Sequence, residues 1–145
     1  MDASTTDEAS AAGATRQRRI DLTRYVAAIA VLVSAIVHFQ QYLAGYSTVS
    51  VIGPLFVLNA VGGVVIAIAV IAWRHWLPTF LAAGFGALTA VGYWYSVLFG
   101  LFGFQETLIG GWPVVVAEIA EYLAVVCGLA ATVMLARNRR AAAMG

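Results

Sequence analysis

The sequence predicts an all-α, polytopic membrane protein built as an antiparallel bundle of four transmembrane helices. The chain of 145 residues is 62% hydrophobic and only 10% charged, whereas soluble domains carry about 25% charged residues. Four apolar stretches are each long enough, at about 1.5 Å per residue, to cross roughly 30 Å of hydrocarbon. The connections between these stretches are short, which favours antiparallel hairpins.

The four predicted spans and two tails account for the whole sequence. The spans are predicted at about residues 24–43, 54–72, 78–101 and 113–136. Proline opens the second and fourth of them at a position suited to a first helical turn. Together the spans form one membrane domain over residues 20–140. Residues 1–19 are polar and unpatterned, so we expect a disordered cytoplasmic tail there, and residues 141–145 form a second cytoplasmic tail.

The basic residues set the expected orientation. All eight are arginines: four lie before or at the start of span one, Arg74 lies between spans two and three, and three follow span four. The connections at residues 44–53 and 102–111 contain none. The positive-inside rule therefore places both termini in the cytoplasm. Heavy use of arginine, alanine, valine and glycine suggests a GC-rich bacterial genome, so we expect a bacterial plasma membrane.

Composition and motifs exclude several classes of function. A net charge of +1 and the absence of a basic surface argue against nucleic-acid binding. Cys127 is the single cysteine, so the chain offers neither an intrachain disulfide nor a metal–thiolate site. We find no phosphate loop, nucleophile elbow or Ser/His/Asp set. We therefore expect no cofactor, and an enzyme is the less favoured class.

Small residues at a spacing of four predict where the helices approach closely. Span four carries Ala120, Ala124, Gly128, Thr132 and Ala136 at this spacing, span three carries Gly92, Ser96 and Gly100, and span one carries Ala30 and Ser34 leading to His38. We expect each stripe to mark a helix–helix contact.

Polar side chains gather at one depth within the predicted spans. Counting along each helix places His38, Asn59 and Glu118 roughly 8 to 9 Å below the outer interface, and Glu121 roughly 13 Å below it. The complete predicted cluster is His38, Asn59, Tyr93, Glu118, Glu121 and Tyr122. Ionisable residues in hydrocarbon are costly and usually face the bundle interior, and Tyr122 lies one turn after Glu118, where it can donate to that carboxylate. No comparable cluster is expected in the inner half.

Four interpretations of this cluster stay open. The polar groups can serve as interhelical hydrogen bonds, as a proton-handling or cation-binding site, as a metal or haem site, or as partners for another membrane protein's helices. The metal interpretation lacks the Glu-x-x-His pairs of di-iron bundles, so we assign no metal ligands. His75, between Trp73 and Trp76, is expected to be an ordinary interfacial residue, and Glu106 is expected to be solvated.

Part of the chain resembles a known pattern. The matching residues are His38-Phe39-Gln40-Gln41-Tyr42, Gly45-Tyr46, Ile52-Gly53-Pro54-Leu55-Phe56 and Leu58-Asn59-Ala60. They resemble small four-span membrane proteins of actinobacteria, over spans one and two. The resemblance implies a four-helix inner-membrane protein whose His-to-Asn region is a shared feature, and it assigns no activity. The architecture is also similar to that of DoxX-like four-span proteins.

These observations lead to two functional hypotheses. The first is a small integral membrane accessory or interaction protein, as a subunit of a larger envelope or respiratory complex. The second is a small proton-coupled transporter or coupling subunit that uses His38, Glu118 and Glu121. In both, the partners are the lipid bilayer and either other membrane proteins or further copies of the chain.

Overall fold

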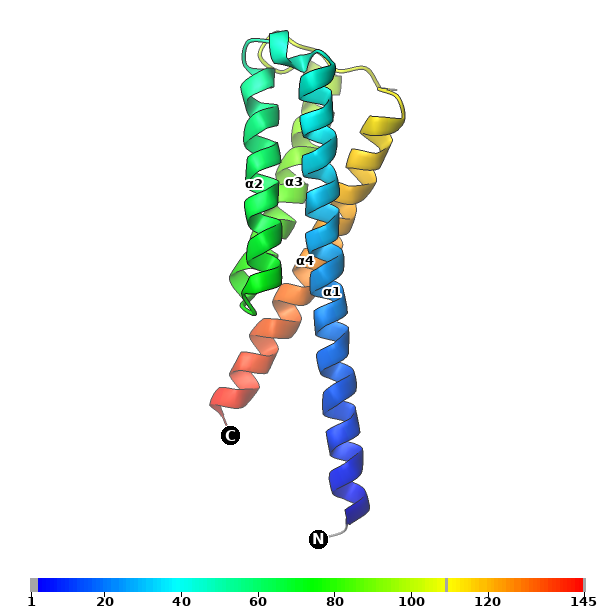
Figure 1. The fold of residues 1–145 in the computed structure, drawn as a ribbon, viewed down its shortest axis with the longest axis vertical. Helices are drawn as coiled ribbons and strands as arrows, with labels where there is room; N and C mark the ends of the chain where they lie inside the picture. The colour runs from blue at the N-terminus through cyan, green and yellow to red at the C-terminus, as the bar shows by residue number, and fades with distance from the viewer. Residues whose placement is uncertain (1–2, 109, 145) are drawn as a thin grey trace.

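The computed structural model describes residues 3–108 and 110–144 and consists of four long helices (Figure 1). The elements are α1 (Ala3–Ala44), the short 3-10 helix η1 (Tyr46–Thr48), α2 (Ile52–Ala72), α3 (Trp76–Phe99) and α4 (Trp112–Ala143). All four α-helices are long and apolar enough to cross a membrane. Within the described ranges there is no strand, only an isolated bridge between Leu101 and Phe104. The prediction of an all-α chain with four long apolar helices is therefore confirmed.

Glycine, proline and histidine set the helix ends. α3 ends at Gly100, where φ is 78°, and α4 begins after Gly111, where φ is 81°, with Pro113 in its first turn. Both glycines adopt a left-handed conformation that residues with a Cβ avoid. His75 precedes α3 and accepts a hydrogen bond from the backbone N–H of Leu77 at 3.1 Å. His75 therefore caps a helix, a role that its expected interfacial position did not include.

Residues 3–19 are helical, whereas the sequence predicted a disordered tail over residues 1–19; residues 1 and 2 lie outside the described residues. α1 begins at Ala3 and continues without a break into the first apolar stretch. The described side chains between Glu8 and Arg19 are exposed, so this segment is helical without packing on the bundle. Several alanines favour the helix, and extending an existing helix avoids the cost of a new nucleus. α4 likewise continues to Ala143, beyond its predicted end.

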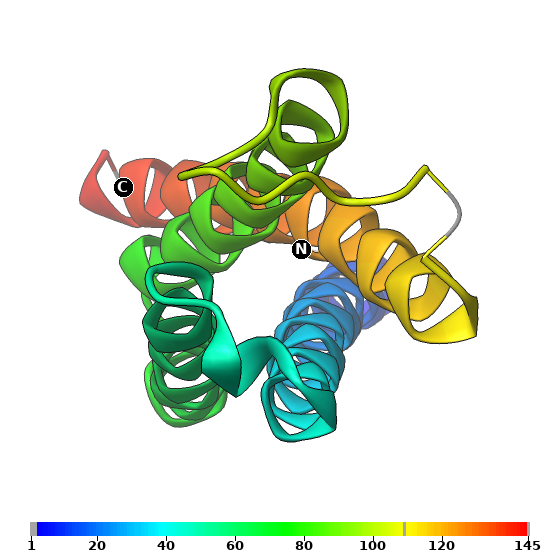
Figure 2. The same ribbon diagram turned by 90° about the horizontal axis from the view of Figure 1, so that it is seen from above.

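α1 and α4 cross near the middle of the molecule, and their ends lie farther apart (Figure 1). α1 rises from the N-terminus, α2 returns, and α4 crosses obliquely behind them toward the C-terminus (Figure 1). We call the end that carries the α1–α2 and α3–α4 connections the loop end, and the opposite end the terminal end. α1 packs closely against α2 and α4, and α4 also packs closely against α3, whereas α2 and α3 touch each other much less. Seen from the loop end, the α3–α4 connection crosses the gap between those two helices (Figure 2).

The core lies toward the terminal end and is built from small side chains. It includes Ala28, Val31, Val70, Ala82 and Ala124, one or two from each helix. Such residues allow close approach of helix backbones. This half of the bundle is therefore closely packed, and the space between the helices opens toward the loop end.

Glycines mark the closest contacts between α3 and α4. A Cβ added at Gly128 would lie 2.8 Å from the backbone oxygen of Thr79 and from the backbone nitrogen of Ala83. A Cβ added at Gly86 would collide with the backbone oxygen of Glu121. The α4 stripe predicted from the sequence therefore does mark a contact through Ala120, Ala124 and Gly128, which are all buried.

The stripe predicted on span three is wrong as a helix contact. A Cβ at Gly92 would meet nothing within 4 Å, and Gly100 terminates α3. Ser96 of this stripe is buried, but its hydroxyl contacts the α3–α4 connection and not another helix. The other buried small residues of α3 are Thr79, Ala82, Ala83, Gly86 and Ala90. The closest backbone contacts of α3 with α4 lie in the first half of α3, around Gly86, whereas farther along the helix Trp94 reaches Tyr122 of α4 through its side chain.

Arg24 is buried in the terminal half, where the sequence suggested only plain packing. It is 1% exposed. Its Nη2 donates to the carbonyl oxygens of Val70 (2.5 Å) and Trp73 (3.3 Å) at the end of α2, and its Nη1 donates to Asp21 at 3.2 Å. Asp21 also pairs with Arg74. Because the last carbonyls of a helix lack intrahelical partners, a cation there stabilises the helix end.

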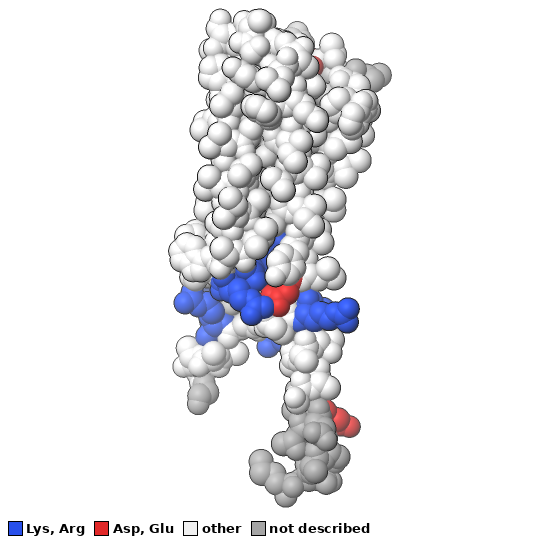
Figure 3. Space-filling model, viewed as in Figure 1, with Lys and Arg blue, Asp and Glu red and all other residues white. Residues whose placement is uncertain are grey.

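Charged side chains gather in one band on the surface. On the face drawn in Figure 3, arginines and an acidic group lie side by side near the terminal end, and the surface from there to the loop end is nearly free of charge. On this face, the arginines that are spread along the sequence therefore lie at one level near the terminal end.

Candidate functional site

A cavity of about 520 Å³ lies in the loop-end half of the bundle. All four helices, η1 and the α3–α4 connection contribute to its lining. Its walls are mainly apolar, with Leu55, Phe56, Phe85, Leu88 and Phe104 among them. α2 packs mainly against α1 and α3 packs mainly against α4, whereas α2 and α3 contact each other much less, which leaves room for the cavity. Its volume lies within the range of about 300–1,000 Å³ that is typical of small-molecule sites.

A buried carboxylate lies at one side of the cavity, on α4. Glu121 is 1% exposed, and its Oε1 accepts a hydrogen bond from Ser34 Oγ of α1 at 3.0 Å. Its Oε2 is buried and has no hydrogen-bond partner. A buried polar group without a partner costs free energy, so this oxygen is a candidate contact for a bound molecule.

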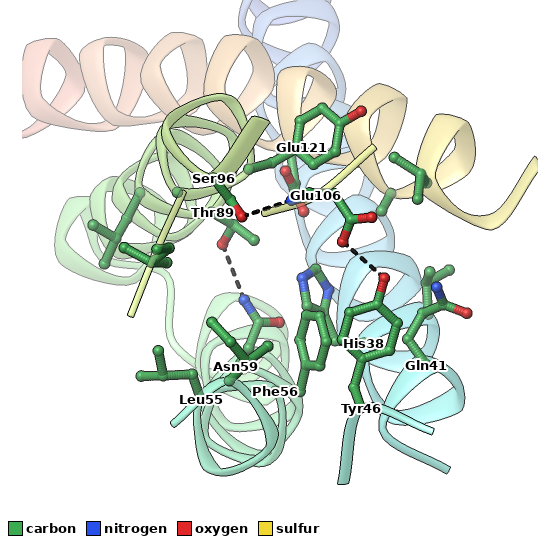
Figure 4. Close-up of a pocket in the computed structure, with 18 of the residues that line it drawn as sticks. His38, Gln41, Tyr46, Leu55, Phe56, Asn59, Thr89, Ser96, Glu106 and Glu121 are labelled. Carbon is green, nitrogen blue, oxygen red and sulfur yellow. Dashed lines mark hydrogen bonds between the residues drawn. The ribbon is translucent and has the colours of Figure 1, made fainter. Parts of the chain in front are cut away.

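His38 continues the same chain of contacts. Its Nδ1 lies 2.9 Å from the backbone oxygen of Ser34 and 3.4 Å from Ser34 Oγ. A hydrogen bond to a carbonyl requires the proton on Nδ1, which leaves Nε2 of the neutral ring as an acceptor. The ring also packs edge-on against Phe56, with centroids 5.0 Å apart. Figure 4 shows His38 and Glu121 facing the same space from α1 and α4.

Asn59 joins α2 to α3 across the narrow side of the cavity. Its Nδ2 donates to Thr89 Oγ1 at 3.0 Å, and Thr89 donates in turn to the backbone oxygen of Phe85 at 2.7 Å. The Oδ1 atom of Asn59 is buried and has no partner. One half of this amide therefore holds the helices together, and the other half is left for a ligand.

The expectation that Glu106 is merely solvated is wrong. Its Oε2 accepts a hydrogen bond from the Tyr46 hydroxyl at 2.7 Å, and its backbone N–H donates to Ser96 Oγ at 3.2 Å. These contacts draw the α3–α4 connection over the cavity and join it to η1 (Figure 4). Burial, together with the neighbouring Glu106 carboxylate, raises the pKa of the Tyr46 phenol, so Tyr46 keeps its proton and acts as the donor.

Replacing Tyr46 with phenylalanine is expected to loosen this connection. The change removes a hydrogen bond to a charged group, worth about 1.5–3 kcal/mol, and leaves the aromatic packing of the ring intact. The backbone amides of Glu106 and Thr107 should then exchange hydrogen faster, which mass spectrometry of deuterium uptake measures. Tyr42→Phe is the control, because no hydrogen bond of the Tyr42 hydroxyl is among the described contacts. Equal uptake in both variants would contradict the role assigned to Tyr46.

The structure brings most of the predicted polar cluster to this one cavity. His38, Asn59, Tyr93, Glu118 and Glu121 all line it. Tyr93 also contacts the α3–α4 connection through weak hydrogen bonds of 3.4 Å to the backbone oxygens of residues 107 and 108. Tyr122 does not line the cavity. It is largely exposed beside Glu118 and accepts a hydrogen bond from Trp94 Nε1 at 2.8 Å.

Several site residues were not identified as such from the sequence. Ser34 was noted only as a small residue in a stripe, and Tyr46, Thr89 and Glu106 were not assigned to the site. Ser34 carried a usable signal, because it lies one turn before His38 on the same helix face. The positions of Tyr46 and Glu106 depend on how two connections fold over the loop end, and no local pattern indicates that.

The geometry limits what the site can do chemically. Among the described residues, no group of three or more His, Cys, Asp or Glu side chains is arranged to hold a metal ion. What the cavity offers is a mainly apolar space with a few hydrogen-bonding and proton-accepting groups at its side. These features suit reversible binding of a small molecule.

Comparison with known proteins identifies no relative. No protein-family model matches the chain, and no curated protein and no solved structure is significantly similar to it. The site must therefore be interpreted from its own geometry.

Proposed function

We propose that this chain is a small accessory protein of a bacterial plasma membrane that holds a small molecule in its loop-end cavity. The observation that carries the proposal is the cavity itself, which contains a buried carboxylate with an unpartnered oxygen, Glu121 Oε2. Native proteins satisfy most buried polar groups. A bound molecule would supply the missing partner.

The proposed setting is an antiparallel bundle that spans the membrane. Large apolar side chains on the outward faces of all four helices support it, for example Ile29, Val65, Val91 and Val126, which are each more than half exposed. In lipid such exposure costs nothing, whereas in water it would be unfavourable. The resemblance of spans one and two to four-span proteins of actinobacteria is in keeping with a bacterial inner membrane.

Both termini are proposed to lie in the cytoplasm, because the arginine band lies at the terminal end. The cavity then opens in the outer half of the membrane. Gly103→Cys, in a background with Cys127→Ser, should react with an impermeant thiol reagent in intact cells, whereas Gly13→Cys should react only after lysis. Space is open beside both glycines. The reverse labelling pattern would overturn this orientation.

The binding function is tested by filling the cavity. Gly92 lines the cavity and has open space around it, so Gly92→Leu occupies the ligand volume without striking backbone. Gly84→Leu, on the same helix and also in open space, is the matched control because Gly84 does not line the cavity.

Native mass spectrometry after gentle extraction provides the measurement. Wild-type protein and Gly84→Leu should carry an additional small-molecule mass, which Gly92→Leu should lose. The same spectra report whether the chain leaves the membrane with another membrane protein or with further copies of itself, as the accessory role predicts. The proposal would be overturned if each of the three proteins showed only the mass of its own chain, with no bound molecule and no partner.

The hydrogen-bonded chain from Glu121 through Ser34 to His38 supports a second candidate, a proton-coupled transporter. Two titratable groups joined by a hydroxyl are suited to passing a proton. Proteoliposomes that enclose a pH-sensitive dye separate the two functions. A transporter moves protons when the co-purified molecule is added, and His38→Gln abolishes this movement. A constant internal pH removes the transporter from consideration.

A further inference from the structure

The buried polar atoms that line the cavity without a hydrogen-bond partner are all acceptors. The buried atoms without a partner there are Asn59 Oδ1, Glu118 Oε2 and Glu121 Oε2, all of them oxygens that accept hydrogen bonds. Nε2 of neutral His38 adds a further acceptor. A ligand that satisfies these atoms must bring hydrogen-bond donors.

The donors of the site are mostly occupied within the protein. Ser34 donates to Glu121, Tyr46 donates to Glu106, and the amide nitrogen of Asn59 donates to Thr89. Gln41 adds both an amide donor and an acceptor to the lining. Few protein donors therefore remain to bind an anion or a carbonyl compound.

The charges of the residues that line the cavity also favour a ligand that brings hydrogen-bond donors. Among the described residues that line the cavity, three are glutamates and none is arginine or lysine. Every described arginine lies near the terminal end or on the helical extensions beyond it, and Arg24 is already engaged with the end of α2. An ionised carboxylate in a low-dielectric site needs a positive partner, and the protein supplies none here apart from His38.

The side chains of the cavity walls indicate the chemical nature of the rest of the ligand. They are mainly apolar, which disfavours a bare hydrated metal ion and suits a molecule with a hydrocarbon body. Aromatic rings also line the cavity beside Glu106: Tyr46, which donates to Glu106, packs against Phe56 at 4.7 Å and against Phe104 at 5.5 Å between centroids. The face of an aromatic ring attracts a cation within about 6 Å.

We infer that the cavity binds a lipophilic amine, with the ammonium group on Glu121 and Asn59 and the hydrocarbon body against the aromatic and aliphatic walls. The inference rests on the proposed binding function and specifies the ligand class. The N–H groups of a protonated amine satisfy the unpartnered oxygens, and its charge neutralises a buried carboxylate.

Three probes that share one apolar body test this inference: 1-aminoadamantane, which is cationic, 1-adamantanol, which is neutral, and 1-adamantanecarboxylate, which is anionic. Equilibrium dialysis against protein in lipid nanodiscs, with empty nanodiscs subtracted, gives the three dissociation constants. The amine should bind at least about tenfold more tightly than the alcohol, and the carboxylate should bind most weakly.

Substituting Glu121 tests whether its carboxylate causes the preference for the amine over the alcohol. Glu121→Gln keeps the shape of the side chain and removes its charge, so affinity for the amine should fall at least about tenfold while affinity for the alcohol stays unchanged. Glu8→Gln, at an exposed position outside the cavity, should leave all three constants unchanged.

The possible results of these measurements test the ligand class and the binding function separately. Equal binding of the amine and the alcohol, both weakened by Gly92→Leu, would overturn the amine inference and leave the binding function standing. Stronger binding of the carboxylate would also overturn it. If no probe binds above the level of empty nanodiscs, the amine inference is overturned, and native mass spectrometry then decides the binding function separately.

Discussion

Replacing Arg24 with methionine is expected to destabilise the protein by about 3–5 kcal/mol, the usual cost of breaking a buried ionic contact. The guanidinium group is almost fully buried and donates to two backbone oxygens at the end of α2 and to Asp21. Methionine fills much of the same space but donates no hydrogen bond. The carbonyls of Val70 and Trp73 then lose this partner, in a helix end that has few others.

Thermal unfolding in a mild detergent measures this loss. Arg18→Met is the matched control, because Arg18 is exposed on the same helix. Arg24→Lys should fall between the two, since lysine keeps the charge but lacks the planar fork that reaches several acceptors at once. If Arg24→Met and Arg18→Met unfold at the same temperature, the buried contact contributes nothing to stability.

Replacing Gly86 or Gly128 with leucine is expected to disrupt the contact between α3 and α4. A Cβ at either glycine meets backbone atoms of the facing helix, which cannot move aside as a side chain can. Overpacking a core costs about 1–3 kcal/mol when side chains give way, and backbone collision should cost at least as much. We therefore expect a clearly lower unfolding temperature for each variant.

Leucine at open glycines controls for the change in residue type. Gly84→Leu on α3 meets nothing within 4 Å and replaces glycine with a better helix former. It should be neutral or slightly stabilising. Wild-type stability of Gly86→Leu and Gly128→Leu would show that α3 and α4 do not approach as closely as described.

The helices and half of the cavity's polar residues could be predicted because both follow from counting along the chain. Each apolar stretch has the length of a membrane, and a helix rises by a fixed distance per residue. His38, Asn59 and Glu118 could therefore be assigned to one depth, with Glu121 about one turn deeper, before any contact was known. Depth does not give direction around the helix axis, which is why Tyr122 was included although it lies outside the cavity.

The parts that could not be predicted depend on long-range geometry. Arg24 was counted with the surface arginines, because nothing near it in the sequence indicates that the end of α2 lies against it. Glu106 is in an irregular connection, and its hydrogen bond to Tyr46 spans 60 positions. The oblique crossing of α4 decides which small residues meet, so Gly92 on α3 lines the cavity and makes no helix contact although its spacing suggests one.

The affinity of a cavity-filled variant for the probes tests most directly whether the loop-end cavity is a binding site. The dissociation constant of 1-aminoadamantane should rise at least about tenfold in Gly92→Leu and stay at the wild-type value in Gly84→Leu. Binding of 1-adamantanol should weaken in the same variant, because leucine at Gly92 occupies space that both probes need. Unchanged constants for both probes in Gly92→Leu would contradict binding in this cavity.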